Sequence, residues 1–133
     1  MALWRVSDPG NVGTLLRAAD AFAAGIALSE GCADPTGPKA VRASMGSLFR
    51  VLMSGFDEPA GKRVALVPSG GIPLPELDSG AEVVLVLGGE REGLPAEVLQ
   101  RCDERASIPQ PGGGDSLNVA MAGAIALYEL ARS

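Results

Sequence analysis

Residues 83–87 form a short, uninterrupted apolar run. A run of this length without polar alternation is typical of a strand that is buried on both faces. Such strands belong to parallel sheets, because the helices that connect parallel strands cover both sides of the sheet. This run therefore predicts an α/β protein built on a parallel sheet flanked by helices on both faces.

The alternation of strands and helices continues along the chain. Strands are predicted at residues 2–6, 26–28, 64–67 and 105–108, and helices at residues 11–24, 39–49, 95–101 and 116–131. The expected inner face of the second helix consists of Val41, Met45, Leu48 and Phe49. No linker is long enough to divide the chain, so residues 1–133 are predicted to form one domain.

Composition excludes several kinds of catalytic site. The sequence contains no histidine, which excludes a Ser-His-Asp triad, a Cys-His pair and a zincin-type metal site. Its two cysteines, Cys32 and Cys102, cannot build a disulfide framework, which indicates a reducing compartment. No apolar run approaches the length of a membrane span, about 18 residues. We therefore expect a cytoplasmic protein with no membrane partner.

Charge is divided unevenly between the two halves of the chain. The formal net charge is −5. Residues 1–63 carry seven Lys/Arg and six Asp/Glu, net +1, whereas residues 64–133 carry four and ten, net −6. A surface that binds a polyanion is therefore expected mostly in the first half. Arg5, Arg17, Lys39, Arg42 and Arg50 form either one local basic patch there or a scattered set of solvated charges.

Two loops at the ends of predicted strands combine glycines with polar residues. Ligands of parallel sheets bind beyond the carboxyl ends of the strands. The loop at residues 7–11 contains Asn11 and leads into a helix that carries Arg17, less than two turns further on. The loop at residues 88–94 contains Glu90 and follows the buried strand directly. Simpler interpretations remain open: Asn11 caps a helix, and the glycines form a turn.

A third loop, residues 110–118, contains three consecutive glycines followed by Ser116 and Asn118. Ordering such a run costs conformational entropy, which indicates a reason to keep it. Neither the Gly-x-Gly-x-x-Gly nor the Walker signature is present in these loops. We expect Asp115 or Ser116 to cap the last helix, with Ser116 and Asn118 in its first turn.

Taken together, these segments resemble the SpoU (TrmH-type) family of SPOUT RNA 2′-O-ribose methyltransferases. The matching segments are DPGNVGTLLRAADAF at residues 8–22, VLVLGGEREGL at residues 84–94 and IPQPGGGDSLNVAMA at residues 108–122. They stand in the order of the family's three motifs and at similar spacing. PKAVRASMGSLFR at residues 38–50 is similar to the family's second-helix segment. The resemblance extends over nearly the whole chain.

This resemblance implies a fold and an activity. The implied fold is the SPOUT α/β fold, in which the C-terminal segment forms a deep trefoil knot. The implied activity is methyl transfer from S-adenosylmethionine to a ribose 2′-hydroxyl of tRNA or rRNA, with no metal. Relatives work as homodimers whose active sites are completed across the subunit interface. Many also have an N-terminal RNA-binding domain, which is absent here. We therefore expect residues 1–133 to be a single catalytic domain, either a minimal enzyme or a catalytic fragment of a longer one.

Site residues follow from the resemblance, position by position. The implied catalytic residues are Asn11, Arg17, Glu90, Ser116 and Asn118. The implied cofactor-binding residues are Leu87, Gly88, Gly89, Glu90, Ile108, Pro109, Ser116 and Leu117. Among the basic residues of the first half, the expected RNA contacts are Arg17, Lys39, Arg42 and Arg50. Arg17 is expected to act as a charged clamp on a phosphate.

Two other functions remain open at the level of sequence. One is a non-catalytic RNA-binding or regulatory subunit with the same fold. The other is an α/β module that binds a small molecule, which explains the glycine loops but not the pairing of Asn11 with Arg17. Cofactor binding without RNA-dependent methyl transfer would favour one of these two.

Overall fold

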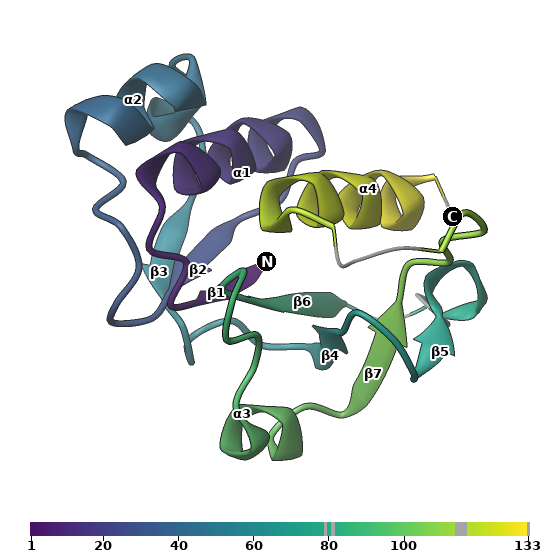
Figure 1. The fold of residues 1–133 in the computed structure, drawn as a ribbon. Helices are drawn as coiled ribbons and strands as arrows, with labels where there is room; N and C mark the ends of the chain where they lie inside the picture. The colour runs from purple at the N-terminus through teal and green to yellow at the C-terminus, as the bar shows by residue number, and fades with distance from the viewer. Residues whose placement is uncertain (79, 81, 114–116, 133) are drawn as a thin grey trace.

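A parallel sheet forms the centre of the molecule (Figure 1). The structure is a computed structural model that describes residues 1–78, 80, 82–113 and 117–132. In this part of the chain the sheet has seven strands, in the order β3-β2-β1-β6-β4-β7-β5. The strands are β1 (Ala2–Trp4), β2 (Ile26–Leu28), β3 (Met53–Gly55), β4 (Lys62–Leu66), β5 (Ile72–Pro73), β6 (Val83–Gly88) and β7 (Glu104–Ser107). All their pairings are parallel, as the sequence predicts.

The apolar run lies in β6, in the middle of the sheet between β1 and β4. Val84, Leu85, Val86 and Leu87 are at most 4% exposed. Alternate residues face the two sides of a sheet, so burial of all four requires cover on both faces. The prediction of a strand buried on both faces is confirmed.

Helices cover both faces of the sheet, unequally (Figure 1). They are α1 (Pro9–Ala21), α2 (Pro38–Ser44), α3 (Ala96–Gln100) and α4 (Val119–Ala131), with the 3-10 turns η1 (Ser47–Phe49) and η2 (Leu74–Glu76). α1, α2 and α4 lie side by side on one face, and α3 lies on the other. The larger core cluster includes Leu15 and Leu16 of α1, whereas Phe56 and Val98 belong to a smaller second cluster.

Two glycines set the close packing of α1 against its neighbours. A Cβ on Gly13 would lie 2.4 Å from the carbonyl oxygen of Ala40 in α2. A Cβ on Gly123 in α4 would lie 2.4 Å from Cδ2 of Leu15. Side chains at these positions would force the helices apart. This packing places the start of α1 near the start of α4, where the candidate site lies.

The helix predicted at residues 39–49 is interrupted. α2 ends at Ser44, and Met45 and Gly46 take left-handed backbone conformations, with φ of +52° and +85°. The chain then turns into η1. Met45 and Phe49, expected on the inner face, are 67% and 84% exposed. That prediction was wrong because the left-handed turn breaks the helical period on which it rested.

The last helix also differs from its predicted bounds. α4 begins at Val119, and its N-cap is Asn118 rather than Asp115 or Ser116. Asp115 and Ser116 lie outside the described residues. The short strands β3 and β5 were not predicted, because neither has a strong apolar pattern. The trefoil knot would involve the C-terminal segment, and it stays a prediction.

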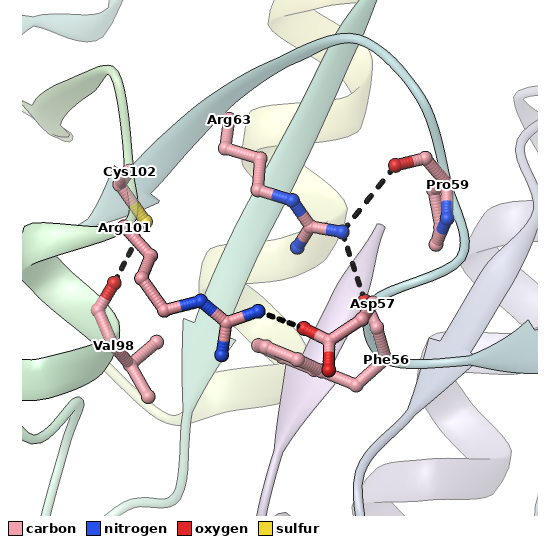
Figure 2. A network of polar contacts seen from close by, with 7 residues as sticks. All are labelled: Phe56, Asp57, Pro59, Arg63, Val98, Arg101 and Cys102. Carbon is pink, nitrogen blue, oxygen red and sulfur yellow. Dashed lines mark hydrogen bonds and ion pairs between the residues drawn. The ribbon is translucent and has the colours of Figure 1, made fainter.

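A polar network fastens the loop after β3 across the α3 side of the sheet (Figure 2). Nη2 of Arg63, on β4, donates hydrogen bonds to the carbonyl oxygens of Phe56 at 3.0 Å and Pro59 at 3.3 Å. The same guanidinium lies 5.5 Å from the centre of the Phe56 ring, a cation–π distance. Arg101 pairs with Asp57. The loop therefore covers part of the face that the short α3 leaves open.

Both cysteines are unpaired and half-buried. The Cys102 thiol donates to the carbonyl oxygen of Val98 at 3.4 Å (Figure 2). Burial raises the pKa of this thiol, which makes it a weak nucleophile at neutral pH. Cys102 is therefore a packing residue. In the described part of the chain, no helix has the length and hydropathy that crossing a bilayer requires.

Candidate active site

Three side chains from the three predicted loops form one hydrogen-bonded cluster. Nδ2 of Asn11 donates to Oε1 of Glu90 at 2.9 Å. Nδ2 of Asn118 donates to the same oxygen at 2.5 Å and to Oδ1 of Asn11 at 3.3 Å. The carboxylate therefore accepts hydrogen bonds from two amides on two different helices. The prediction that the three loops share one end of the sheet is confirmed for these residues.

The starts of two helices orient the asparagines. Asp8 caps α1, because its Oδ1 accepts from the backbone N–H groups of Gly10 at 2.7 Å and Asn11 at 3.1 Å. Asn11 lies inside the helix and is not its cap. Asn118 caps α4 through Oδ1, which accepts from Ala120 N at 2.9 Å and Met121 N at 3.2 Å.

Asparagine suits position 118 better than the other common capping residues. Its amide oxygen caps the helix while its amide nitrogen remains available as a donor. An aspartate would cap the helix equally well but would place a second negative charge against Glu90. A serine is too short to form both contacts at once. Asparagine at this position thus both caps α4 and donates a hydrogen bond to Glu90, a combination that the sequence alone did not reveal.

Glu90 is carried by a tight loop after β6. Gly93 N donates to Gly89 O at 2.9 Å, and Gly89 N donates to Trp4 O at 3.1 Å. A Cβ on Gly88 would lie 2.4 Å from the carbonyl carbon of Gly93. The resemblance implies that Gly88 and Gly89 bind the cofactor, and the simpler interpretation was that the glycines form a turn. In the structure, the space beside Gly88 is filled by the backbone of the loop itself.

A cavity of about 410 Å³ lies beside this loop, within the range of small-molecule sites, roughly 300–1,000 Å³. The predicted cofactor residues that line it are Leu87, Gly88, Gly89, Glu90, Ile108 and Leu117. Pro109 is not among the lining residues, and Ser116 lies outside the described part of the chain. Sequence reasoning missed Leu66, the last residue of β4, and Val67 and Pro68, which follow it. The sequence did predict a strand at residues 64–67. Only the sheet topology shows that this strand lies beside β6 and that its end can therefore line the same cavity.

A second cavity, of about 520 Å³, borders the same loop. It shares Gly89–Gly93 and Val119 with the first cavity, and its own lining includes Arg5, Asp8 and Asn11. Glu90 therefore lines both cavities, and the first of them is the more apolar. Among the described residues, no group of three or more Cys, Asp or Glu side chains forms a candidate metal site.

Arg17 lies apart from the cluster. Its side chain is exposed, and within the described ranges it makes no hydrogen bond or ion pair. At about 100° per residue, side chains six positions apart leave a helix about 120° from each other. Asn11 points toward the start of α4, so Arg17 leaves the helix in a different direction. The structure therefore does not bring Arg17 to Glu90 within one chain.

The other expected RNA contacts differ in their surroundings. Arg50 hydrogen-bonds Asp20 through Nε at 2.9 Å and forms an ion pair with it through Nη2 at 2.8 Å. The hydrogen bond from Arg50 holds the pKa of the Asp20 carboxyl below its usual value. Arg50 thus ties η1 to α1. Lys39 and Arg42 are exposed, and Lys39 Cε lies 3.8 Å from the Cβ position of Gly10 at the start of α1.

Known proteins share the sequence pattern and the fold of this chain. Residues 1–128 match the profile of the SpoU rRNA Methylase family. The chain is 35% identical to the 23S rRNA (guanosine(2553)-2′-O)-methyltransferase RlmP of Bacillus subtilis, over 94% of this chain and 54% of that protein. A crystal structure of an AdoMet-bound rRNA methyltransferase from Sinorhizobium meliloti superposes with a TM-score of 0.90 at 40% identity, covering 98% of this chain and 54% of that one.

A shorter solved chain is also similar. It comes from a structure concerned with the 2-OH methylation of C/U34 on tRNA, and it superposes with a TM-score of 0.87 at 31% identity, covering 98% of this chain and 92% of that one. This chain spans about half the length of the curated relatives it matches. The profile match, the fold and the three convergent loops lead to one conclusion: the chain belongs to the SpoU rRNA methylase family.

Proposed function

We propose that this chain is an S-adenosylmethionine-dependent methyltransferase acting on a ribose 2′-hydroxyl of rRNA or tRNA. The observation that carries the proposal is the Asn11–Glu90–Asn118 cluster, whose central residue, Glu90, lines both cavities. Similar proteins named for rRNA 2′-O-methylation and for tRNA 2-OH methylation support it. We also propose that residues 1–133 act as one catalytic domain, in the cytoplasm.

The first cavity fits S-adenosylmethionine. Leu87, Ile108 and Leu117 offer apolar surface, and Glu90 and Gln110 are polar residues in the same lining. A mostly apolar lining with few polar groups is typical of cofactor sites. When bound, the cofactor supplies an electrophilic methyl group on a sulfonium sulfur. The apolar side chains exclude water from the transfer.

Glu90 orients the ribose in this proposal. Its Oε1 accepts from Asn11 and Asn118, which fixes the carboxylate in place. Within the described residues Oε2 makes no hydrogen bond, so it is available to accept one from a ribose hydroxyl. Ser116 remains a proposed ribose contact, at a position outside the described residues. Correct alignment of reacting groups supplies several kcal/mol of the rate enhancement, while the hydroxyl proton passes to a phosphate or to water.

We propose a homodimer that uses the outer face of α4. Met121, Ile125 and Tyr128 are 55%, 41% and 57% exposed. Their spacing places them on one side of the helix, a pattern typical of a helix that packs against a partner. α1 packs beside α4 (Figure 1). Arg17, on α1, is exposed. A second copy on this face would let Arg17 act at the partner's site, while Lys39 and Arg42 contact the RNA.

S-Adenosylhomocysteine is expected to bind with a stoichiometry of one per subunit and micromolar affinity, measured by calorimetric titration. Replacing Ala122 by phenylalanine adds bulk to the wall of the first cavity. We expect this variant to bind at least about tenfold more weakly, because overpacking displaces the ligand. Ala131→Phe, at the exposed end of the same helix, is the matched control and should bind as the wild type does.

The titration also separates the competing functions. Binding, followed by transfer of labelled methyl groups to the 2′-oxygen of rRNA or tRNA, supports the proposal. A folded dimer that binds no S-adenosylhomocysteine would favour a non-catalytic subunit. Equal binding by wild type and Ala122→Phe would place the cofactor elsewhere.

Introducing a charge on the α4 face should separate the subunits. Ile125→Asp is expected to sediment as a monomer at concentrations where the wild type is a dimer, because a buried unpaired carboxylate is costly at an interface. Methyl transfer should fall with it if Arg17 acts across the interface. Leu52→Asp, at another exposed apolar position, is the control and should remain dimeric. A monomeric wild type, or a dimeric Ile125→Asp, would refute this interface.

A further inference from the structure

Arg5 holds an unusual backbone conformation at the edge of the second cavity. Its φ is +50°, in the left-handed region that favours glycine. Residues with long side chains adopt this region at an energetic cost, and such strain is concentrated at functional sites. A glycine here would relieve the strain, so the presence of arginine points to a use for its side chain.

Ser29 and the loop that contains Gly89 hold the backbone of Arg5 from two sides. Arg5 N donates to Oγ of Ser29 at 2.9 Å. On the other side, a Cβ on Gly89 would lie 2.8 Å from the carbonyl oxygen of Arg5, so the loop that carries Glu90 packs directly on this residue. The position of Arg5 is therefore coupled to that of the Asn11–Glu90–Asn118 cluster.

The side chain of Arg5 is supported without being neutralised. Its Cγ would lie 3.0 Å from a Cβ on Gly31, so its aliphatic part covers that glycine. Its guanidinium carbon lies 5.6 Å from the centre of the Trp4 ring. Within the described part of the chain it forms no ion pair with a carboxylate. The nearby carboxylates of Asp8 and Glu90 are engaged with backbone or side-chain amides.

We propose that Arg5 is a substrate-positioning residue that binds an RNA backbone phosphate beside the ribose held at Glu90. This inference rests on the proposed function, because it assumes that the second cavity receives the RNA. An arginine fork matches the oxygens of a phosphate and retains its charge at all physiological pH values. Its stacking on Trp4 reduces the conformational freedom that binding would otherwise remove.

Replacing Arg5 by glycine tests the role of the side chain without changing the backbone conformation. Glycine adopts a φ of +50° without strain, so the variant should fold at least as stably as the wild type. We expect it to bind a fluorescein-labelled single-stranded RNA decamer about tenfold more weakly at low salt, measured by anisotropy. The slope of log Kd against log salt concentration should fall by about 0.7, the value for one lost phosphate contact on a single strand.

Ala23→Gly is the matched control, because Ala23 also has a positive φ, +55°, and lines neither cavity. It should bind the decamer as the wild type does. Unchanged affinity and salt slope in Arg5→Gly would overturn the proposal, as would an equal loss in Ala23→Gly or failure of the wild type to bind the decamer. Calorimetry with S-adenosylhomocysteine distinguishes a failure of the Arg5 proposal from a failure of the proposed function. If the wild type does not bind S-adenosylhomocysteine, the proposed function itself fails.

Discussion

Arg17→Lys is expected to lower the rate of methyl transfer by about 10²- to 10³-fold, the effect of removing one well-placed charged donor from a transition state. Lysine retains the charge but loses the planar fork that binds two phosphate oxygens at once. Because Arg17 is exposed and makes no hydrogen bond or ion pair within the described residues, the free energy of unfolding should change by less than about 0.5 kcal/mol. Affinity for S-adenosylhomocysteine should also stay the same.

The expected role of Arg17 is a clamp rather than a base. Taking a proton from a guanidinium at pH 7 costs about 7 kcal/mol, which is too much for a general base when water or a phosphate is available. The measurement is single-turnover methyl transfer to RNA by the variant and by Arg42→Lys, an exposed arginine on the neighbouring helix. Wild-type turnover in Arg17→Lys would contradict the clamp. An equal loss in Arg42→Lys would show that the assay reports general RNA affinity instead.

Glu90→Ala is expected to reduce methyl transfer by a similar factor, about 10²-fold or more, for a different reason. The substitution removes the acceptor shared by Asn11 and Asn118, so the loop after β6 loses its connection to both helices. Because these groups are exposed to water, the loss of stability should be modest, about 1–2 kcal/mol in urea unfolding. Affinity for S-adenosylhomocysteine should fall as well, since the same loop lines the first cavity.

Glu90→Gln tests whether methyl transfer depends on the charge of Glu90 or on its hydrogen bonds to Asn11 and Asn118. A glutamine oxygen still accepts hydrogen bonds from both asparagines, so stability and S-adenosylhomocysteine affinity should remain near the wild-type values. If Glu90 accepts a hydrogen bond from the ribose, methyl transfer should still fall, because a neutral amide is a weaker acceptor. Full activity in Glu90→Gln would show that Glu90 has only a structural role. Full activity in Glu90→Ala would show that Glu90 has no role in methyl transfer.

Several features of the fold were predictable because they depend on local sequence. The apolar run of β6 specified a strand buried on both faces. Apolar residues at helical spacing specified α1, although Asp8 rather than Asn11 proved to be its cap. The helix predicted at residues 39–49 failed at Met45 and Gly46, where two successive left-handed residues override a continuous helical pattern.

By itself, the sequence indicated the three loops that carry the candidate site residues, because each loop follows a predicted strand and contains its own polar residues. Only the tertiary structure decided how those residues meet. Glu90 lies 79 residues from Asn11 and 28 from Asn118, and the three converge because β1 pairs with β6 and α1 packs against α4. The left-handed backbone of Arg5 and the exposure of Arg17 are likewise properties that only the tertiary structure shows. The spacing of apolar residues along the chain indicates which face of each segment is buried. Contacts between distant segments depend instead on strand order and helix packing, which no local pattern encodes.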